Sequence, residues 1–228
     1  MDDRVQTIML EGMPVIFALP YKRRYDATGR REAAARTRQA ILGAALQQFT
    51  ARGYIATPMA AIAEQAGVAL ETVYASVGRK AALARLLIET AISGTGQAVP
   101  AQDRDYVRAI QVASDAETKI TLYAAAMRAI VGRLAPVLGI LQQAAPTEPE
   151  LAALWREIAE RRAANMRRFV ADLATVATLR MDPDEAADIV WATNAPELHQ
   201  LLVGQRGWSP DRYERFLVDT WRRLLLAE

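Results

Sequence analysis

Residues 57–87 contain the feature that most restricts the fold, which is a pair of short apolar-periodic segments joined by a glycine. The segment reads TPMAAIAEQAGVALETVYASVGRKAALARLL. Ile62 lies on the inward face of the first segment, Gly67 provides a turn, Val68 fills the angle, and Val73 packs beneath the second segment. Two short helices packed in this way form a helix-turn-helix, whose second helix can present its first turn to the major groove of DNA.

The second helix of this unit carries polar and rim groups. The side chains expected to face outward from it are Leu70, Glu71, Thr72 and Tyr74. The Tyr74 hydroxyl, Thr57 at a helix N-terminus and Lys80 are suited to phosphate oxygens, which fix register without reading sequence. Two packed short helices also occur in helical domains that bind no nucleic acid, so the spacing alone leaves both interpretations open.

Charge is distributed unevenly along a chain whose net charge is only +2. Residues 22–38 contain seven basic and two acidic residues, or 7 − 2 = +5, and residues 1–92 contain 12 and 8, or +4. Residues 93–228 contain 16 and 18, or −2. The basic front half favours an anionic partner, and Arg23 and Arg24 are candidates to reach a DNA minor groove.

Residues 1–30 show no sustained hydrophobic period and include Pro14 and Pro20. We expect a mobile basic arm here. Met9 and Met13 closely follow the first residue, so the sequence does not decide whether this arm is natively translated or ordered.

The rest of the chain is rich in alanine, leucine and arginine and is predicted to be helical. The helices are expected at about 31–51, 58–66, 70–75, 79–92, 103–113, 116–133, 136–144, 148–177, 183–205 and 210–226. The fold class is therefore all-α, with a three-helix helix-turn-helix domain at residues 31–92 and a larger C-terminal helical domain at residues 93–228. The stretch SGTGQAVP after residue 92 is the best linker candidate.

Several helix ends carry sequence signals. Thr57-Pro58 and Ser209-Pro210 place a cap before a first-turn proline, and Asp182 with Glu185 has capping-box spacing. Thr147 with Glu150 has the same capping-box spacing. Pro196 is expected to kink or split the helix that begins at Pro183.

The residue inventory argues against catalysis and metal binding. The chain has no cysteine and one histidine, His199, so thiolate sites and multi-histidine centres are excluded. No Gly-rich phosphate loop is present. We therefore expect no metal, no cofactor and no enzyme. The alternative is an enzyme that uses His199 as general base, oriented by Glu197 or Asp188.

No apolar run approaches the roughly 18–20 residues of a membrane-spanning helix. The N-terminal sequence begins with acidic residues, and Glu11, Pro14 and Pro20 interrupt its apolar stretch. A secretory signal has a basic start and an unbroken apolar stretch. We expect a cytoplasmic protein without a membrane partner.

Residues 31–92 resemble the DNA-binding domain of the tetracycline-repressor (TetR) family of bacterial regulators. The matching pieces are FTARGY at 49–54, Thr57, Met59, Ile62, Ala63, AGV at 66–68, TVY at 72–74, Lys80 and Leu83. The resemblance is strong over the front third of the chain, and the rear is similar only in its number of helices. It implies a recognition helix at about 70–75 and a fourth helix linked to a ligand domain.

The resemblance also implies roles for individual residues. Positions that match DNA-backbone contacts of the family are Thr57, Thr72, Tyr74 and Lys80, and positions where base contacts vary are Leu70 and Glu71. Two positions depart from the family pattern. Ala69 replaces the usual capping serine, a loss of about 1 kcal/mol of capping, and Val77 replaces an aromatic residue behind the recognition helix. Both leave the pose of that helix on DNA open.

The rear half holds all four tryptophans and several apolar helix stripes. The candidate ligand-binding residues are Tyr123, Met127, Trp155, Met166, Trp191, Asn194 and His199. Such stripes are typical of a core as well as of a pocket, and both interpretations apply to each residue. The last two helices, over 183–226, resemble the pair through which family members form homodimers.

Together these features predict a sequence-specific, homodimeric DNA-binding transcriptional regulator. It would be a repressor of a pseudo-palindromic operator on double-stranded DNA, released by a small apolar or amphipathic effector. The alternative among binding proteins is a ligand-independent DNA-binding dimer. Activation in place of repression also stays open, and the effector, the operator and the regulated genes cannot be derived from the sequence.

Overall fold

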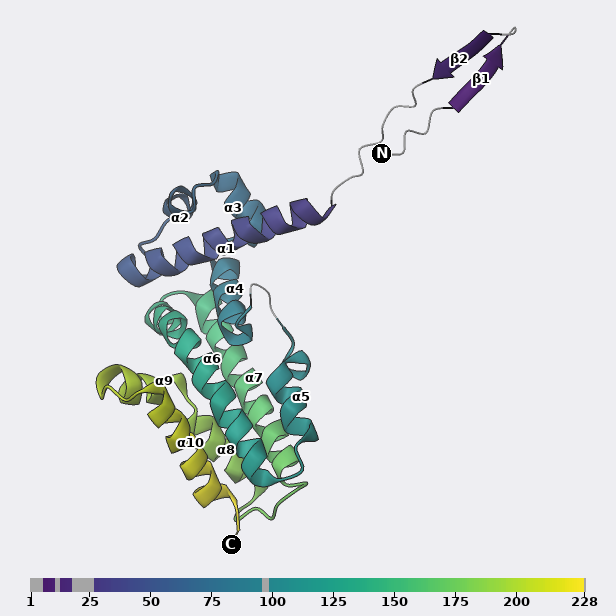
Figure 1. Ribbon diagram of the computed structural model, residues 1–228. Coiled ribbons are helices and arrows are strands. Elements are labelled where there is room, and N and C mark those ends of the chain that lie inside the picture. Colours follow the sequence, from purple (N-terminus) through teal and green to yellow (C-terminus); the bar gives the residue numbers. More distant parts are fainter. Residues whose placement is uncertain (1–5, 11–12, 18–26, 96–98, 228) are drawn as a thin grey trace. The chain divides into compact units, whose positions relative to one another are not determined.

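The computed structural model describes residues 6–10, 13–17, 27–95 and 99–227 (Figure 1). The chain divides into two compact units, Met1–Ala34 and Ala35–Glu228. The second unit is built from helices, so the predicted all-α fold class is confirmed.

A β-hairpin lies in the first unit, within residues 1–30, where the sequence predicted a mobile basic arm. Strands β1 (Gln6–Leu10) and β2 (Met13–Phe17) pair antiparallel, with Gln6 opposite Phe17 and Leu10 opposite Met13. Both segments contain β-branched residues, which favour extended backbone. Pro14 pairs with Met9 and is tolerated because each strand of a two-stranded ribbon is an edge.

Four helices form the front of the chain. They are α1 (Ala27–Arg52), α2 (Met59–Ala66), α3 (Leu70–Val77) and α4 (Lys80–Ser93). Their shared core includes the fully buried side chains Ile41, Phe49, Ile62, Val73 and Leu83. The predicted helices at 58–66, 70–75 and 79–92 are therefore correct to within two residues.

The remaining elements form a helical bundle. They are η1 (Ala101–Asp103), α5 (Asp105–Val112), α6 (Ala116–Ala144), α7 (Pro149–Leu173), α8 (Pro183–Thr193), α9 (Pro196–His199), the π-helical η2 (Gln200–Gln205) and α10 (Pro210–Leu225). Helix α6 packs against α4, α5, α7, α9 and α10, and α7 packs against α8 (Figure 1). The bundle thus reaches α4 directly. The boundary expected after residue 92 stays a prediction.

Helix α6 is continuous where the sequence predicted two helices. Pro136 lies inside it and removes one backbone hydrogen bond to residue 132. Both Gly132 and Pro136 are exposed, so water can hydrate the carbonyl that loses its partner. The sequence does not reveal this because it does not show which face of the helix meets solvent.

The predicted helix caps have mixed outcomes. The Ser209 hydroxyl accepts from the Arg212 N–H, and the Asp182 carboxylate accepts from the Asp184 N–H. The Thr147 cap is wrong, because α7 begins after Glu148 and the Thr147 hydroxyl donates to the Ala144 carbonyl. The break at Pro196 is confirmed, since α8 ends at Thr193 and α9 begins at Pro196.

The expectation about apolar runs needs correction. Helix α6 has an 18-residue window with a mean hydropathy of 1.6, enough by length and composition to cross a membrane. Half of that window is buried inside the bundle, and α6 is the helix on which five others pack. The same composition is typical of the central core helix of a globular protein.

Candidate functional site

The turn between α2 and α3 has the geometry of a helix-turn-helix. Gly67 adopts a left-handed conformation with φ of 67°, and its N–H donates to the Ala63 and Glu64 carbonyls. Val68 is partly buried against the core, and Val73 is fully buried on the inner face of α3. These placements confirm the packing predicted for residues 57–87.

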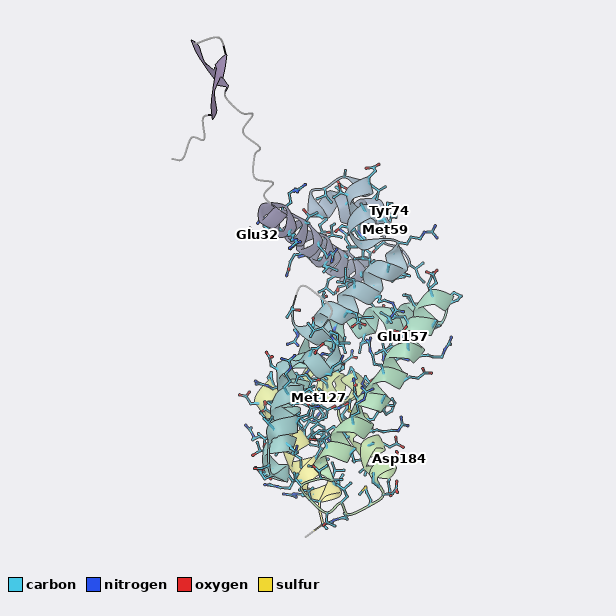
Figure 2. All side chains as sticks on the ribbon, turned by 90° about the vertical axis from the view of Figure 1, so that its right-hand side faces the viewer. Glu32, Met59, Tyr74, Met127, Glu157 and Asp184 are labelled. Atoms are coloured by element: carbon cyan, nitrogen blue, oxygen red, sulfur yellow. The ribbon has the colours of Figure 1, made fainter. Side chains whose placement is uncertain are left out.

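The outer face of α3 carries most of the predicted DNA contacts. Glu71, Thr72 and Tyr74 are exposed, and the side chain of Tyr74 is 47% exposed on the surface of α3 (Figure 2). Leu70 is half-buried and packs partly against the core. The face is therefore small, polar and accessible, as the direct reading of base edges requires.

Thr57 occupies a different position from the one expected. Its side chain is fully buried, and its hydroxyl donates to the Gly53 carbonyl at 2.8 Å and to the Gln48 carbonyl at 3.2 Å. Helix α2 has no side-chain cap, since Pro58 stands at that position. The predicted cap is thus wrong. The hydroxyl predicted to contact phosphate instead ties the end of α1 to the turn before α2.

Lys80 lies at the first turn of α4 and is half-buried. Its Nζ donates to the Ile55 carbonyl at 3.2 Å and lies 4.4 Å from the centre of the Tyr54 ring. Burial lowers the pKa of Lys80, although Glu148 opposes that effect. Burial also raises the pKa of Tyr54 to about 12, with Glu148 and Glu150 adding to the shift. The remaining predicted contacts, Arg23 and Arg24, lie outside the described residues.

Four of the seven predicted ligand residues line one cavity of about 60 Å³, namely Tyr123, Met127, Met166 and Asn194. The Tyr123 hydroxyl donates to the Met166 sulfur at 2.7 Å, and the Asn194 amide donates to the same sulfur at 3.2 Å. Tyr123 also stacks on Phe169, with ring centres 4.0 Å apart. Met127 lies among the bundle helices (Figure 2).

Trp155 and Trp191 line a second cavity of about 350 Å³, together with Leu138, Ile158 and Arg162. This volume falls within the range of about 300–1,000 Å³ that is usual for small-molecule pockets. Ile158 and Arg162 line both cavities. The two groups of predicted residues therefore meet at these two side chains of α7.

Arg162 is the functional candidate that sequence reasoning missed. Its Nη2 donates to the Trp191 carbonyl at 3.0 Å and to the Asn194 Oδ1 at 2.9 Å, and its guanidinium lies 5.1 Å from the Trp191 ring centre. Burial lowers its pKa, while nearby Glu197 opposes that effect. The signal that could have indicated it is its position, because Arg162 is the charged member of an otherwise apolar helix stripe that includes Ile158 and Met166.

His199 lies apart from both cavities. It is buried, its ring meets the edge of Tyr213 with centres 5.0 Å apart, and its Nδ1 has no hydrogen-bond partner among the described residues. Glu197 accepts from Gln142 at 2.7 Å, so it is engaged away from the histidine. Glu197 therefore does not orient His199, and Asp188, the other carboxylate named for that role, is exposed on α8. The described residues also contain no cluster of three or more His, Asp or Glu that could hold a metal.

Helix α4 is connected to α7 by two ion pairs. Arg85 binds Glu157 through two contacts of 2.6 Å, and Glu89 binds Arg161 at 2.7 Å (Figure 2 labels Glu157). Arg133 of α6 adds a hydrogen bond of 2.8 Å to the Ala91 carbonyl. The helix that follows the helix-turn-helix is thus held by charged groups of the helices that line the cavities.

This geometry defines a class of protein, a helix-turn-helix DNA-binding protein with a helical, cavity-bearing second half. Residues 41–87 match the sequence model of bacterial regulatory proteins of the tetR family. The resemblance to that family is thereby confirmed over residues 41–87, the segment that holds α2, α3 and most of α4. A search of curated protein sequences found no significant match.

Solved structures share the fold over most of the chain. A protein from Mesorhizobium loti MAFF303099 described as a TetR-family transcriptional regulator is 21% identical, with a TM-score of 0.62 over 85% of this chain and 98% of its own. NalD, the secondary repressor of the MexAB-OprM multidrug efflux pump in Pseudomonas aeruginosa, is 21% identical, with a TM-score of 0.65 over 84% and 98%. A transcriptional regulator from Saccharomonospora viridis in complex with choline is 18% identical, with a TM-score of 0.63 over 87% and 100%.

Proposed function

We propose that this protein is a homodimeric repressor that binds a pseudo-palindromic operator through α3 and leaves it when a small apolar or amphipathic molecule fills the bundle. The observation that carries the proposal is the pairing of an exposed polar face on α3 with cavities whose walls are bonded to α4. The first feature binds DNA, and the second makes that binding conditional.

On DNA, the exposed side chains of α3 divide into two roles. Glu71 in the first turn is placed to accept from a cytosine amine, whereas Thr72 and Tyr74 bring hydroxyls to phosphate oxygens. Lys80 adds positive charge beside them, from the start of α4. Leu70 provides an apolar rim for a base methyl group.

The homodimer is formed through residues 183–226. Within this range Leu224 is 43% exposed, Leu201 is 49% exposed, and Ile189 and Phe216 are partly buried. A two-fold axis through α8 and α10 gives two copies of α3, which read half-sites about 34–36 Å apart on one face of DNA.

Ligand control is supported by the cavities and by the relatives. NalD is itself a repressor, and the Saccharomonospora viridis regulator holds a small molecule, choline. A ligand that separates α7 from α4 would move the helix that carries the helix-turn-helix. Such coupling commonly changes affinity by about 1–3 kcal/mol, or 5- to 150-fold.

A ligand-independent dimer is the competing function. A ligand-independent dimer would have closely filled packing around Tyr123 and Trp155. Each of these residues instead lines a cavity. The ligand-controlled repressor is therefore the better fit. Because its target is chromosomal DNA, we place it in the cytoplasm.

The deciding experiment selects bound sequences from random duplex DNA at two salt concentrations. Recovery of a pseudo-palindrome with half-sites one helical turn apart is the expected result. Sequence-blind, salt-sensitive binding alone would contradict the proposal for the front half. For the rear half, a molecule that binds tightly and leaves operator affinity unchanged would contradict ligand control.

A further inference from the structure

The smaller cavity is lined by an unusual set of charges. Three arginines line it, Arg104, Arg161 and Arg162, alongside the amides of Asn165 and Asn194. The described residues that line it include no aspartate or glutamate. An apolar cavity with several guanidinium groups and no carboxylate is electrostatically prepared for an anion.

The charge of Arg162 is not balanced by a carboxylate contact. Its hydrogen bonds go to the Trp191 carbonyl and the Asn194 amide oxygen, which are both neutral. Arg104 likewise donates to the neutral Val99 carbonyl. Both arginines are partly buried. A charge that is partly removed from water without a contacting counter-charge is costly, and arginine retains its proton in proteins. An anionic ligand would remove that cost.

Two further donors around the cavities lack acceptors in the described part of the chain. They are Nη2 of Arg161, which lines the small cavity, and the indole Nε1 of Trp191, which lines the large one. Buried donors are nearly always satisfied, so each unsatisfied one requires an explanation. Both are N–H groups, and a ligand that carries acceptor oxygens would satisfy them.

We infer that the effector is an amphipathic anion, whose carboxylate binds Arg161 and Arg162 and whose apolar tail fills the cavity between Trp155 and Trp191. This inference rests on the proposed ligand-controlled regulator and adds the chemical class of its effector. A guanidinium binds a planar carboxylate through two parallel hydrogen bonds, which is the strongest recognition that these side chains offer.

The sizes of the two cavities suit this division. The small cavity of about 60 Å³ has room for about two water molecules at 30 Å³ each, or one carboxylate group. The large cavity of about 350 Å³ has mostly apolar walls, with Glu197 as its one described acidic residue. Arg162 and Ile158 belong to both, so a single molecule can extend from one cavity into the other.

Arg161 connects the ligand to DNA binding. Its Nη1 holds Glu89 of α4 at 2.7 Å, while its Nη2 is the donor that lacks an acceptor. A ligand carboxylate that binds both Nη atoms of Arg161 in a bidentate contact displaces Glu89 from Nη1. The anion therefore weakens a bond that holds α4, which links cavity occupancy to the position of the helix-turn-helix.

The test compares three probes that share an eight-carbon chain: octanoate, octanol and octylammonium. Binding to the full-length protein is measured by titration calorimetry at pH 7 without DNA. We expect octanoate to bind about 10- to 100-fold more tightly than octanol, as a charge-assisted hydrogen bond allows. Octylammonium is expected not to bind.

The variant Arg162→Met tests the charge directly, because methionine keeps much of the side-chain volume. We expect it to lower octanoate affinity about 10- to 100-fold and to leave octanol affinity unchanged. Arg156→Met is the matched control, since Arg156 is an exposed arginine on the same helix. It should leave all three affinities unchanged.

Glu89→Gln tests the link to α4. Removal of the competing carboxylate should tighten octanoate binding several-fold, and by reciprocity it should weaken operator binding in the absence of any probe. A merely structural role for Glu89 would lower operator affinity without tightening octanoate binding, and that result would overturn the link.

Equal binding of octanol and octanoate, or an anion preference that survives in Arg162→Met, would overturn the inference. So would failure of all three probes to bind. Release of the operator by octanol alone would contradict an anionic effector, but it would agree with the proposed ligand-controlled repressor. Failure of the proposed function itself would show separately, in the DNA selection.

Discussion

The residues on and beside α3 fall into two groups. Some side chains hold the domain together, and others can contact DNA. Thr57 belongs to the first group, because its hydroxyl is buried against two carbonyls. Tyr74 belongs to the second, because it is exposed on the outer face of α3. Lys80 belongs to both, since it packs on Tyr54 while carrying its charge at the surface of the domain.

Tyr74→Phe should weaken operator binding by about tenfold, because it loses a hydroxyl contact to phosphate. Lys80→Met should also weaken operator binding, because it loses a positive charge near the phosphates. The loss should be similar for all sequences, because phosphate contacts do not read bases. Lys80→Met keeps the alkyl chain over Tyr54 and should reduce the salt slope by about one. Binding titrations at several salt concentrations measure both effects, and a change in preference at one base pair would place α3 differently in the groove.

His199 should make stability depend on pH. Burial lowers its pKa in the folded protein from the ordinary value of 6.5, so the unfolded chain binds the proton more readily. Stability is then complete above pH 6.5 and falls as the pH drops through that value. Melting temperatures at pH 7.5 and 5.5 should therefore differ less in His199→Leu than in the parent protein. An equal difference in both would show that other groups cause the pH dependence.

At the level of elements, one buried cation joins three helices. Lys119 of α6 is 1% exposed, and its Nζ contacts the Ile110 carbonyl of α5 and the Asp172 carboxylate of α7, each at 2.6 Å. No local signal in the sequence indicates a lysine inside the bundle. Asp172 lies 53 residues from Lys119 along the chain, so the pair forms only when α7 packs against α6.

Asp172→Asn should destabilise the fold by about 3 kcal/mol, because it leaves a buried ammonium without its counter-charge. Lys119→Met should cost much less, because it removes the fully buried charge and leaves Asp172, whose side chain is 27% exposed and can be hydrated. Urea unfolding measures the free energy of each variant, with the exposed Asp188→Asn as a control. Greater loss in Lys119→Met than in Asp172→Asn would contradict this account.

Helices were predictable from the sequence wherever local signals dominate. Gly67 marks the end of α2, and Ser209-Pro210 marks the start of α10, because a turn glycine and a cap act within a few residues. The continuity of α6 through Pro136 depends on solvent exposure, which is set by tertiary packing. For the same reason the sequence indicated Tyr123 and Asn194 as cavity residues but not Arg162, whose importance arises from what surrounds it.

In the whole molecule, α8 and α10 divide their apolar residues between the bundle and the surface. Leu217 and Trp221 of α10 are fully buried within one chain, whereas Leu224 is 43% exposed and Phe216 is partly buried. Trp221 donates to the Thr193 hydroxyl at 2.7 Å, which secures α10 to the end of α8. The surface of α10 that remains for the proposed second copy is accordingly its more exposed edge.

Leu224→Arg should give a folded monomer, because Leu224 is 43% exposed and its replacement places a charge in the proposed homodimer contact. Operator affinity should then fall by at least about 100-fold, since each half-site binds without its linked neighbour. Sedimentation velocity and operator titration measure the two effects. Val112→Arg is the control, at an 84% exposed position on α5, and dimerisation unchanged in Leu224→Arg would move the interface elsewhere.

The tryptophans give this protein a built-in optical signal. All four lie at positions 155, 191, 208 and 221, so the helix-turn-helix segment contains none. Trp155 and Trp191 line the 350 Å³ cavity, and the Trp191 ring faces the Arg162 guanidinium. Intrinsic fluorescence therefore responds to the occupant of the bundle and not directly to the bound duplex. A single sample can accordingly report two events: tryptophan emission reports effector binding, and a dye on the DNA reports release of the duplex.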